Sequence, residues 1–223
     1  LNHVTSPDGI IFNTVEVGSD PGGYLEIGIR FRSNNATEIN WSEVSLTSEG
    51  VTWTPDVTFM NAHGGTTNFG VANAGTYRAA NATRISVRDA VNLTDPVVYE
   101  LPAGGGTAST DNVVLGELDN EEVPLGGAVD YFFQKEAEFP NGGTDYGTLP
   151  TATVPSTITS ISGAGVQVMT LVEDGDAGFV DVGTTYYGKI MIRIWLEGWD
   201  PDTFNSILSD TISVSFRFSD PNA

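Results

Sequence analysis

The sequence contains no cysteine and only two histidines, His3 and His63. Without cysteine there is no disulfide and no thiol chemistry. Two histidines so far apart in the sequence make a Ser-His-Asp triad or a histidine-rich zinc site improbable. The remaining route to catalysis is a pair of carboxylates, and among 29 acidic residues some pair is inevitable. We therefore expect a protein that is not an enzyme and has no resident cofactor.

Basic residues are also scarce, since 9 Lys and Arg stand against 29 Asp and Glu, for a formal net charge of −20. Nucleic acid and anionic lipid bind mainly through Lys and Arg, so such a surface repels both. A run of about 20 apolar residues, which a membrane-spanning helix needs, is absent too. We expect neither a nucleic-acid partner nor membrane insertion. The acidic surface keeps a secreted protein soluble, or else reflects adaptation to salt or Ca²⁺.

The absence of cysteine fits a protein of a Gram-positive bacterial or archaeal surface better than a small eukaryotic extracellular module. The first residues, Leu1-Asn2-His3, do not begin a signal peptide. We expect the mature form of a secreted protein that is extracellular or lies on the cell surface.

Apolar and polar residues alternate with a period of two along much of the chain, which predicts β-strands. The clearest strand covers residues 24–32, and two more cover residues 190–197 and 212–218. Shorter strands are expected at 44–46, 51–53, 57–60, 84–88, 97–101, 113–118, 129–134, 157–161, 166–172 and 179–182. Many short strands separated by turn residues predict an all-β fold, an antiparallel β-sandwich of jelly-roll type.

One short helix is predicted near the C-terminus. Asp200-Pro201-Asp202 is typical of an N-cap with proline at the first helical position, so residues 203–208 form one or two turns. The domain expectation is a single β-sandwich over residues 24–223, preceded by an N-terminal extension over residues 1–23.

The extension contains an apolar segment over residues 10–17, separated from the domain by a Gly- and Pro-rich stretch. Such a tethered strand pairs with its own sheet or adds to the sheet edge of a neighbouring molecule. The donor-strand candidates are Ile10, Ile11, Phe12, Val15 and Val17.

Three further groups of residues are candidate binding or modification sites. Asp174, Asp176 and Asp181 cluster oxygen ligands suitable for Ca²⁺, although an exposed hairpin turn explains them as well. Sequons for N-glycosylation occur at Asn35, Asn40, Asn81 and Asn92. Trp53, Trp195 and Trp199 could form a sugar-stacking platform, or could be covered by a second sheet or a subunit interface.

Residues 192–202 resemble a signature near the C-terminus of secreted Gram-positive proteins, which also carry segments similar to residues 29–33 and 83–87. In size, acidic character, sandwich pattern and lack of cysteine, the chain resembles the TasA and camelysin group of biofilm-fibre subunits. The resemblance implies a jelly-roll subunit that passes its N-terminal strand into the next subunit.

These observations favour a structural subunit of an extracellular filament, a pilus or biofilm-matrix fibre, which polymerises with itself by β-strand addition. Two alternatives stay open: a carbohydrate-binding or adhesin module on the cell surface, and a viral jelly-roll structural protein. The filament hypothesis requires residues 10–17 to reach a neighbouring copy.

Overall fold

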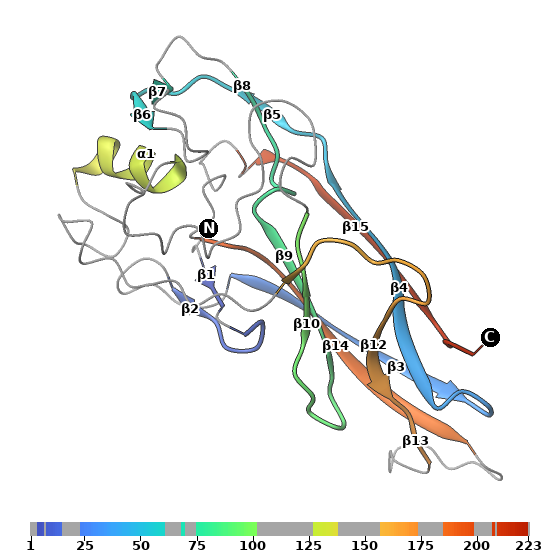
Figure 1. Ribbon diagram of the computed structural model, residues 1–223. Coiled ribbons are helices and arrows are strands. Elements are labelled where there is room, and N and C mark those ends of the chain that lie inside the picture. Colours follow the sequence, from blue (N-terminus) through green and yellow to red (C-terminus); the bar gives the residue numbers. More distant parts are fainter. Residues whose placement is uncertain are drawn as a thin grey trace.

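The computed structural model describes residues 4–6, 8–14, 23–60, 68–69, 75–101, 127–137, 157–173, 185–198, 207 and 209–222. Within these residues most regular structure is β-strand, which confirms the all-β expectation (Figure 1). The elements are β1 (Val4–Thr5), β2 (Asn13–Thr14), β3 (Tyr24–Ser33), β4 (Glu38–Ser48), β5 (Val51–Trp53), β6 (Phe59–Met60), β7 (Asn68–Phe69), β8 (Gly75–Tyr77), β9 (Thr83–Asp89), β10 (Val97–Tyr99), α1 (Gly127–Glu136), β11 (Thr157–Ile158), β12 (Val166–Thr170), β13 (Val172–Glu173), β14 (Tyr186–Leu196) and β15 (Ile212–Ser219).

Six strands form the main sheet, in the order β11-β10-β9-β14-β13, with β3 also paired to β14. Strands β3 and β9 run antiparallel to β14 on its two sides. Strand β11, however, pairs with β10 in parallel. The expectation of a purely antiparallel fold is therefore wrong for this edge. A parallel neighbour needs a long connection, which residues 100–156 supply.

The second sheet has the antiparallel order β12-β4-β15, and it packs face to face with the main sheet. Buried side chains from both sheets form one core between them. The second sheet contributes Ile39, Trp41, Leu46, Val168 and Met169, and the main sheet contributes Ile85, Val87, Ile190 and Ile192. The two layers agree with a sandwich, whereas the jelly-roll order of the strands stays a prediction.

The alternation along β14 decides which side chains reach this core. Ile190 and Ile192 are fully buried in it, while Met191, Arg193 and Trp195 point to the other face of the sheet. We call that second face the outer face of the main sheet. Because residues paired across strands share a face, it also carries alternate residues of β3 and β9.

Helix α1 corrects the sequence-based expectation of a strand over residues 129–134. Val129, Tyr131 and Phe133 alternate as in a strand, but the helical period places Tyr131 one turn before Lys135. Both side chains bind Asp56, with the Tyr131 hydroxyl at 2.9 Å and the Lys135 ammonium at 2.7 Å. The hydrogen bond from Lys135, followed by that from Tyr131, lowers the pKa of Asp56. Tertiary contacts thus favour the helix over the local pattern.

Of the helix expected over residues 203–208, the structure describes only Ile207. Ile207 has 3₁₀ conformation, as does Ser209 just beyond this range. Just after it, the Asp210 carboxylate accepts hydrogen bonds from the backbone N–H groups of Gly50, Ala79 and Thr211. It thereby joins three segments before β15 begins. None of the helices in the described ranges is long and apolar enough to span a membrane.

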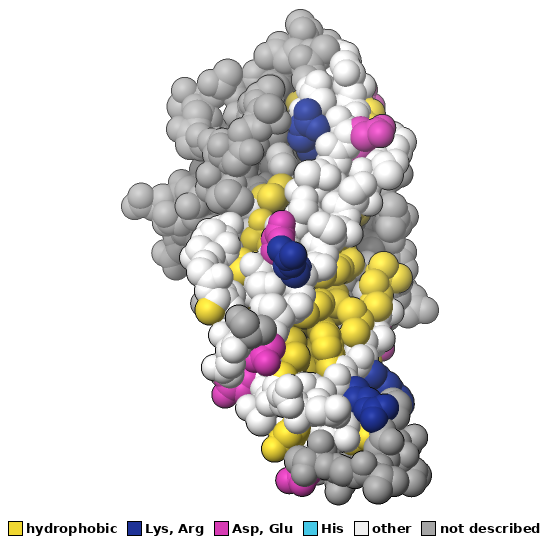
Figure 2. All heavy atoms as spheres, turned by 90° about the vertical axis from the view of Figure 1, so that its right-hand side faces the viewer, with side chains coloured by type: hydrophobic (Ala, Val, Ile, Leu, Met, Phe, Trp, Pro, Cys, Tyr) yellow, Lys and Arg dark blue, Asp and Glu magenta, His cyan; other side chains and the backbone are white. Residues whose placement is uncertain are grey.

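Strands β3 and β15 lie at the same open side of the two layers. Phe31 and Phe218 meet across the layers, with ring centroids 5.7 Å apart. No strand in the described part of the chain pairs with the outer edge of either β3 or β15. The apolar side chains of both strands are only partly buried, and a band of hydrophobic side chains is visible on the face shown in Figure 2.

Candidate functional site

The first described residues fold into a small hairpin, in which β1 pairs with β2 in antiparallel register. Its loop is closed by side chains of the segment itself. Asp8 Oδ1 accepts hydrogen bonds from the N–H groups of Ile10 and Ile11 at 2.8 and 2.7 Å. Ser6 Oγ accepts one from Gly9 N at 2.8 Å and donates one to the carbonyl of Ile11 at 2.7 Å. We call residues 4–6 and 8–14 the docked segment.

Backbone atoms of the docked segment bind the outer face of the main sheet. The carbonyl of Val4 accepts a hydrogen bond from Gly198 N at 2.8 Å. Farther along, the carbonyl of Gly9 accepts one from Ser86 Oγ at 2.9 Å, and that of Ile10 accepts one from Arg193 Nη1 at 2.7 Å. The domain therefore recognises three carbonyl groups of the segment, whatever side chains these residues carry.

Two apolar side chains anchor the segment at its ends. Val4 is fully buried and packs with Val98 and Trp195, which are 1% and 2% exposed. Phe12 stacks on Tyr24 with ring centroids 4.1 Å apart and meets Trp195 edge-on at 5.2 Å. Burying large apolar side chains supplies most of the affinity of such a contact, while the backbone hydrogen bonds fix its register.

Charged groups complete the surface that holds the segment, which we call the cradle. The buried carboxylate of Glu197 accepts hydrogen bonds from Trp195 Nε1 at 2.9 Å and from Ser6 N at 3.4 Å. Arg193 forms an ion pair with Glu26 at 2.8 Å, and its guanidinium group lies against the rings of Phe12 and Tyr24. A buried carboxylate needs donors, and here one donor comes from the docked segment itself.

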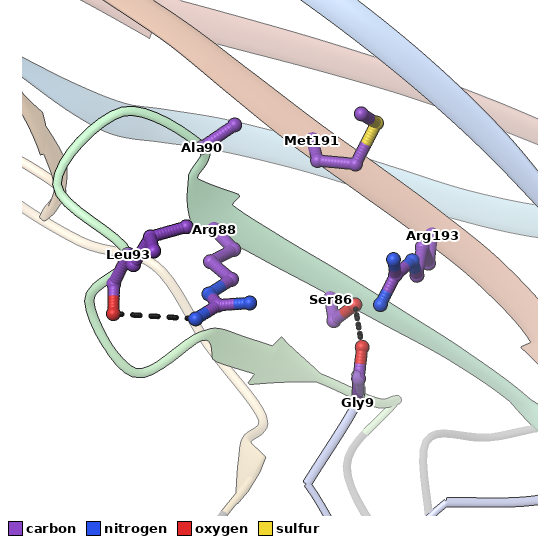
Figure 3. A pocket seen from close by; sticks show the side chains of 7 residues that line it. All are labelled: Gly9, Ser86, Arg88, Ala90, Leu93, Met191 and Arg193. Carbon is purple, nitrogen blue, oxygen red and sulfur yellow. Dashed lines mark hydrogen bonds between the residues drawn. The ribbon is translucent and has the colours of Figure 1, made fainter. Parts of the chain in front are cut away.

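A pocket of about 110 Å³ lies beside the docked segment (Figure 3). Gly9 and Ser86 form part of its wall, together with Met191 and the guanidinium groups of Arg88 and Arg193. The loop after β9 contributes Ala90 and Leu93. Both guanidinium groups already donate to protein oxygens, that of Arg88 to backbone carbonyls and that of Arg193 to Glu26 and to the carbonyl of Ile10.

The loop at this pocket is held in a strained conformation. Leu93 has a positive φ of 54° and is 64% exposed. The guanidinium group of Arg88 donates hydrogen bonds to the carbonyls of Thr94 at 2.9 Å and Leu93 at 3.2 Å and so fixes the loop to β9. Within the described ranges Arg88 has no carboxylate partner. A positive φ on a leucine costs energy that the surrounding contacts must offset.

The predicted donor residues lie partly in the docked segment. Ile10 and Ile11 are in bends of its loop, and Ile11 is 60% exposed, so among the described residues 10–14 the expected strand is present at Asn13–Thr14. Phe12 is the anchor described above. Val15 and Val17 lie outside the described residues.

The three candidate tryptophans do not form a shared platform in the described part of the chain. Trp195 is buried by the chain's own docked segment. Trp53 is partly buried and packs edge-on against Tyr77 and Tyr131, with ring centroids 5.2 and 5.0 Å apart. Trp199 lies outside the described residues. The expected sugar-stacking role has no support from Trp53 or Trp195.

The four sequons differ in their surroundings. The side-chain N–H₂ of Asn40 donates to the carbonyl of Ala164, and Asn40 is 7% exposed. That of Asn92 donates to Asp89 Oδ2 and to a carbonyl of β12. Asn81 is partly buried in the turn before β9, whereas Asn35 is exposed in the turn after β3. A glycan would displace existing hydrogen bonds at Asn40 and Asn92, so Asn35 is the best placed acceptor.

The calcium candidates Asp174, Asp176 and Asp181 lie outside the described residues, so a Ca²⁺ site there stays a prediction. Among the residues that the structure does describe, no group of three or more His, Asp or Glu side chains could hold a metal ion.

Sequence reasoning missed most of the cradle. Ser86 lies in a strand that the sequence predicts, but nothing local indicates that its hydroxyl binds the carbonyl of Gly9, 77 positions earlier. Val4, which the cradle buries, is a single valine in a segment without a strong pattern. Glu197 offered the one available signal, because a carboxylate two residues after Trp195 on a strand shares its face. Comparison with protein-family models, with curated proteins and with solved structures finds no match for this chain.

Proposed function

We propose that the chain is a structural subunit of an extracellular filament, in which the docked segment of one copy occupies the cradle of the next. The subunit is a secreted, cell-surface protein with a jelly-roll-type sandwich, its partner is a second copy, and no catalytic activity is assigned to it. The resemblance to biofilm-fibre subunits supports this proposal, and so does the way in which the segment is bound.

The observation that carries the proposal is that the docked segment binds like a separate peptide. It forms its own hairpin, presents three carbonyl groups to the domain and inserts Val4 and Phe12 as anchors. These are the elements of recognition by β-strand addition, in which backbone hydrogen bonds and alternate side-chain pockets act together. A cradle that accepts its own segment also fits the identical segment of a neighbour.

Exchange between copies preserves every contact of the docked segment. The closed monomer and the filament differ only in the path of residues 15–22, which join the segment to β3. Docking within one chain through so short a connection in sequence corresponds to an effective concentration on the order of millimolar. Exchange therefore prevails where subunits are crowded to a similar concentration, as on a cell surface, and each exchanged segment links one subunit to the next.

A cysteine pair tests this exchange, because the natural chain has no competing thiol. A Cβ atom at Gly9 would lie 2.8 Å from that of Ser86, so the Gly9→Cys/Ser86→Cys protein needs a shift of about 1 Å to reach disulfide geometry. The protein is concentrated, oxidised and examined on a denaturing gel. Exchange predicts a ladder of covalent multimers.

Two controls make the result decisive. The single variant Ser86→Cys shows how much linkage arises from chance collisions. Oxidation of the double variant in dilute solution shows that the pair closes within one chain when neighbours are absent. Filaments or concentrated samples that contain only internally linked monomers would refute the exchange of the docked segment.

A further inference from the structure

Strand β3 offers a long unpaired edge to a partner. It pairs with β14 from Tyr24 to Ser33, and no strand in the described part of the chain lies along its other side. Tyr24, Leu25 and Ile27 are 39%, 57% and 36% exposed, unusually high values for apolar residues of a ten-residue strand. Such an edge is a template for another strand, and the second sheet leaves Leu25 and Ile27 of the core face partly uncovered.

We infer that two copies of the chain pair through β3, antiparallel about a twofold axis at Gly28. The sequence of the strand itself, Tyr-Leu-Glu-Ile-Gly-Ile-Arg-Phe-Arg over residues 24–32, supports this pairing. It is complementary to its own reverse, so one patch serves both copies, as a twofold interface requires. This contact is separate from the exchange of the docked segment and does not rest on it.

In this register each face of the new strand pair is matched. On the core face Leu25 lies opposite Phe31 of the other copy, and Ile27 lies opposite Ile29. On the outer face Glu26 lies opposite Arg30. Directly opposed apolar pairs and opposite charges both stabilise antiparallel strands.

The remaining outer-face pair also fits, since Tyr24 lies opposite Arg32 and an arginine packs favourably on an aromatic ring. A shift that centred the axis on Ile29 would place Gly28 opposite Arg30 and Leu25 opposite Ser33. A shift to Ile27 would place Glu26 opposite Gly28. The axis at Ile29 would still pair Glu26 with Arg32 and Ile27 with Phe31. Of these three registers, however, only the axis at Gly28 gives each residue from 24 to 32 a matched partner.

The chain's own contacts leave Glu26 able to make this pair. Its Oε2 atom binds Arg193 at 2.8 Å, while Oε1 has no hydrogen-bond partner among the described residues. Gly28 lies at the centre of the edge, with only the flexible side chains of Lys189 and Met191 near its Cβ position. The close approach of two strands at the axis therefore meets no bulky side chain of β3.

Reversing one charge at a time tests the pairing in solution. Glu26→Arg and Arg30→Glu each turn two attractive contacts per dimer into repulsive ones. We expect each variant alone to associate at least about tenfold more weakly than the wild type in sedimentation velocity. In a mixture of the two variants, opposite charges again face each other across the new strand pair at these two positions, so the mixture regains dimers. Because recovery requires both chains to be folded, it also excludes misfolding as the cause.

Matched controls carry the same charge changes on the second sheet. Glu43→Arg and Arg217→Glu alter an exposed ion pair on β4 and β15, with 3.3 Å between its atoms, and should leave the β3 dimer unchanged. Three outcomes would overturn the inference: a wild type that is monomeric at its highest soluble concentration, single variants that dimerise normally, or a mixture that does not recover.

The docked segment of another copy is the competing occupant of this edge. The internally linked Gly9→Cys/Ser86→Cys monomer excludes it, because its segment is fixed in its own cradle. We expect this linked protein to dimerise through β3 as the wild type does. A linked protein that stays monomeric would assign the edge to the segment instead and refute the β3 pairing, whereas the gel ladder tests segment exchange separately.

Discussion

Val4→Ala tests how firmly the docked segment is held. Val4 is fully buried between Val98 and Trp195, and the substitution removes two methyl carbons. The lost transfer free energy and the cavity left behind together cost about 2 kcal/mol. If the segment opens on its own, its open population rises by about 30-fold. In the proposed filament the exchanged segment would lose the same contacts as the closed monomer, so the fraction assembled should stay constant while segments exchange faster.

Hydrogen exchange of two neighbouring amides measures this opening. The N–H of Gly198 is bound to Val4, so its exchange should accelerate about 30-fold in Val4→Ala. The N–H of Glu197 is bound to Ala82 within the domain and should keep its protection. Ile11→Ala is the matched control, because Ile11 is 60% exposed and loses little on truncation. Equal acceleration at Gly198 and Glu197 would show that the segment opens only with the whole domain.

Three further predictions concern stability, each measured by urea unfolding. Glu100 and Arg84 form a buried ion pair with 2.5 Å between Oε2 and Nε. Glu100→Gln should lower the free energy of unfolding by about 3 kcal/mol, and the double variant Glu100→Leu/Arg84→Met should recover most of that loss. Additive losses in the double variant would contradict a coupled pair. Burial raises the pKa of Asp210, but the hydrogen bonds that its carboxylate accepts from backbone N–H groups outweigh burial and lower the pKa below 3.8. The carboxylate therefore stabilises the fold fully above pH 3.8, and this stabilisation is lost as the pH falls through the lowered pKa. Asp210→Asn should lower the free energy of unfolding by about 1 kcal/mol at pH 7 and flatten its dependence on acid pH. Gly165→Ala drives a Cβ atom into the backbone carbonyl of Trp41 on β4. It should lower the free energy of unfolding by several times the roughly 1 kcal/mol of Gly163→Ala, because Gly163 has a similar positive φ but lies in open space. Equal losses in the two variants would show that φ alone matters.

Three of the four longest strands in the described residues could be predicted because their patterns are local, whereas β4 (Glu38–Ser48) was expected only at residues 44–46. In β3 and β15 apolar residues alternate with polar ones over eight residues. In β14 isoleucine occupies every second position from Ile190 to Ile194, and one face of each of the three strands turns toward the other sheet. Short strands such as β8 have no such pattern. Their pairing depends on a partner strand elsewhere in the chain, so a single sequence window does not contain the information.

Helix α1 was mistaken for a strand because two periods coexist in ten residues. Alternate apolar residues favour a strand, but Asp56, more than seventy positions earlier, binds both Tyr131 and Lys135 on one helical face. Likewise the pattern of β14 places Trp195 on the face opposite the aliphatic stripe and leaves open whether that face is covered. Trp195 is buried because the docked segment, nearly two hundred positions earlier, covers it. In both cases a contact with a residue far away in the sequence decides the structure, and the local pattern does not contain that contact.

Within the candidate site, residues 10–14 could be singled out from sequence because a short apolar stretch precedes a Gly- and Pro-rich break. The anchor Val4 could not, because a lone valine has no pattern. The cradle is assembled from β3, β9, β10, β14 and residues just after β14, whose common position appears only once the sheet forms. The sequence thus indicated the segment but not the surface that binds it.

The separation of the docked segment from its cradle also has a consequence for the order of events during synthesis. Ser6 binds Glu197 across 191 positions, so the segment leaves the ribosome long before β14 and the residues that follow it. Contacts of such high sequence separation form late in folding. Each new chain therefore presents a free segment before it owns a complete cradle, and already folded neighbours hold cradles of the same shape. Under the proposed exchange of segments, a chain in this interval could enter a neighbour's cradle without first opening a closed monomer.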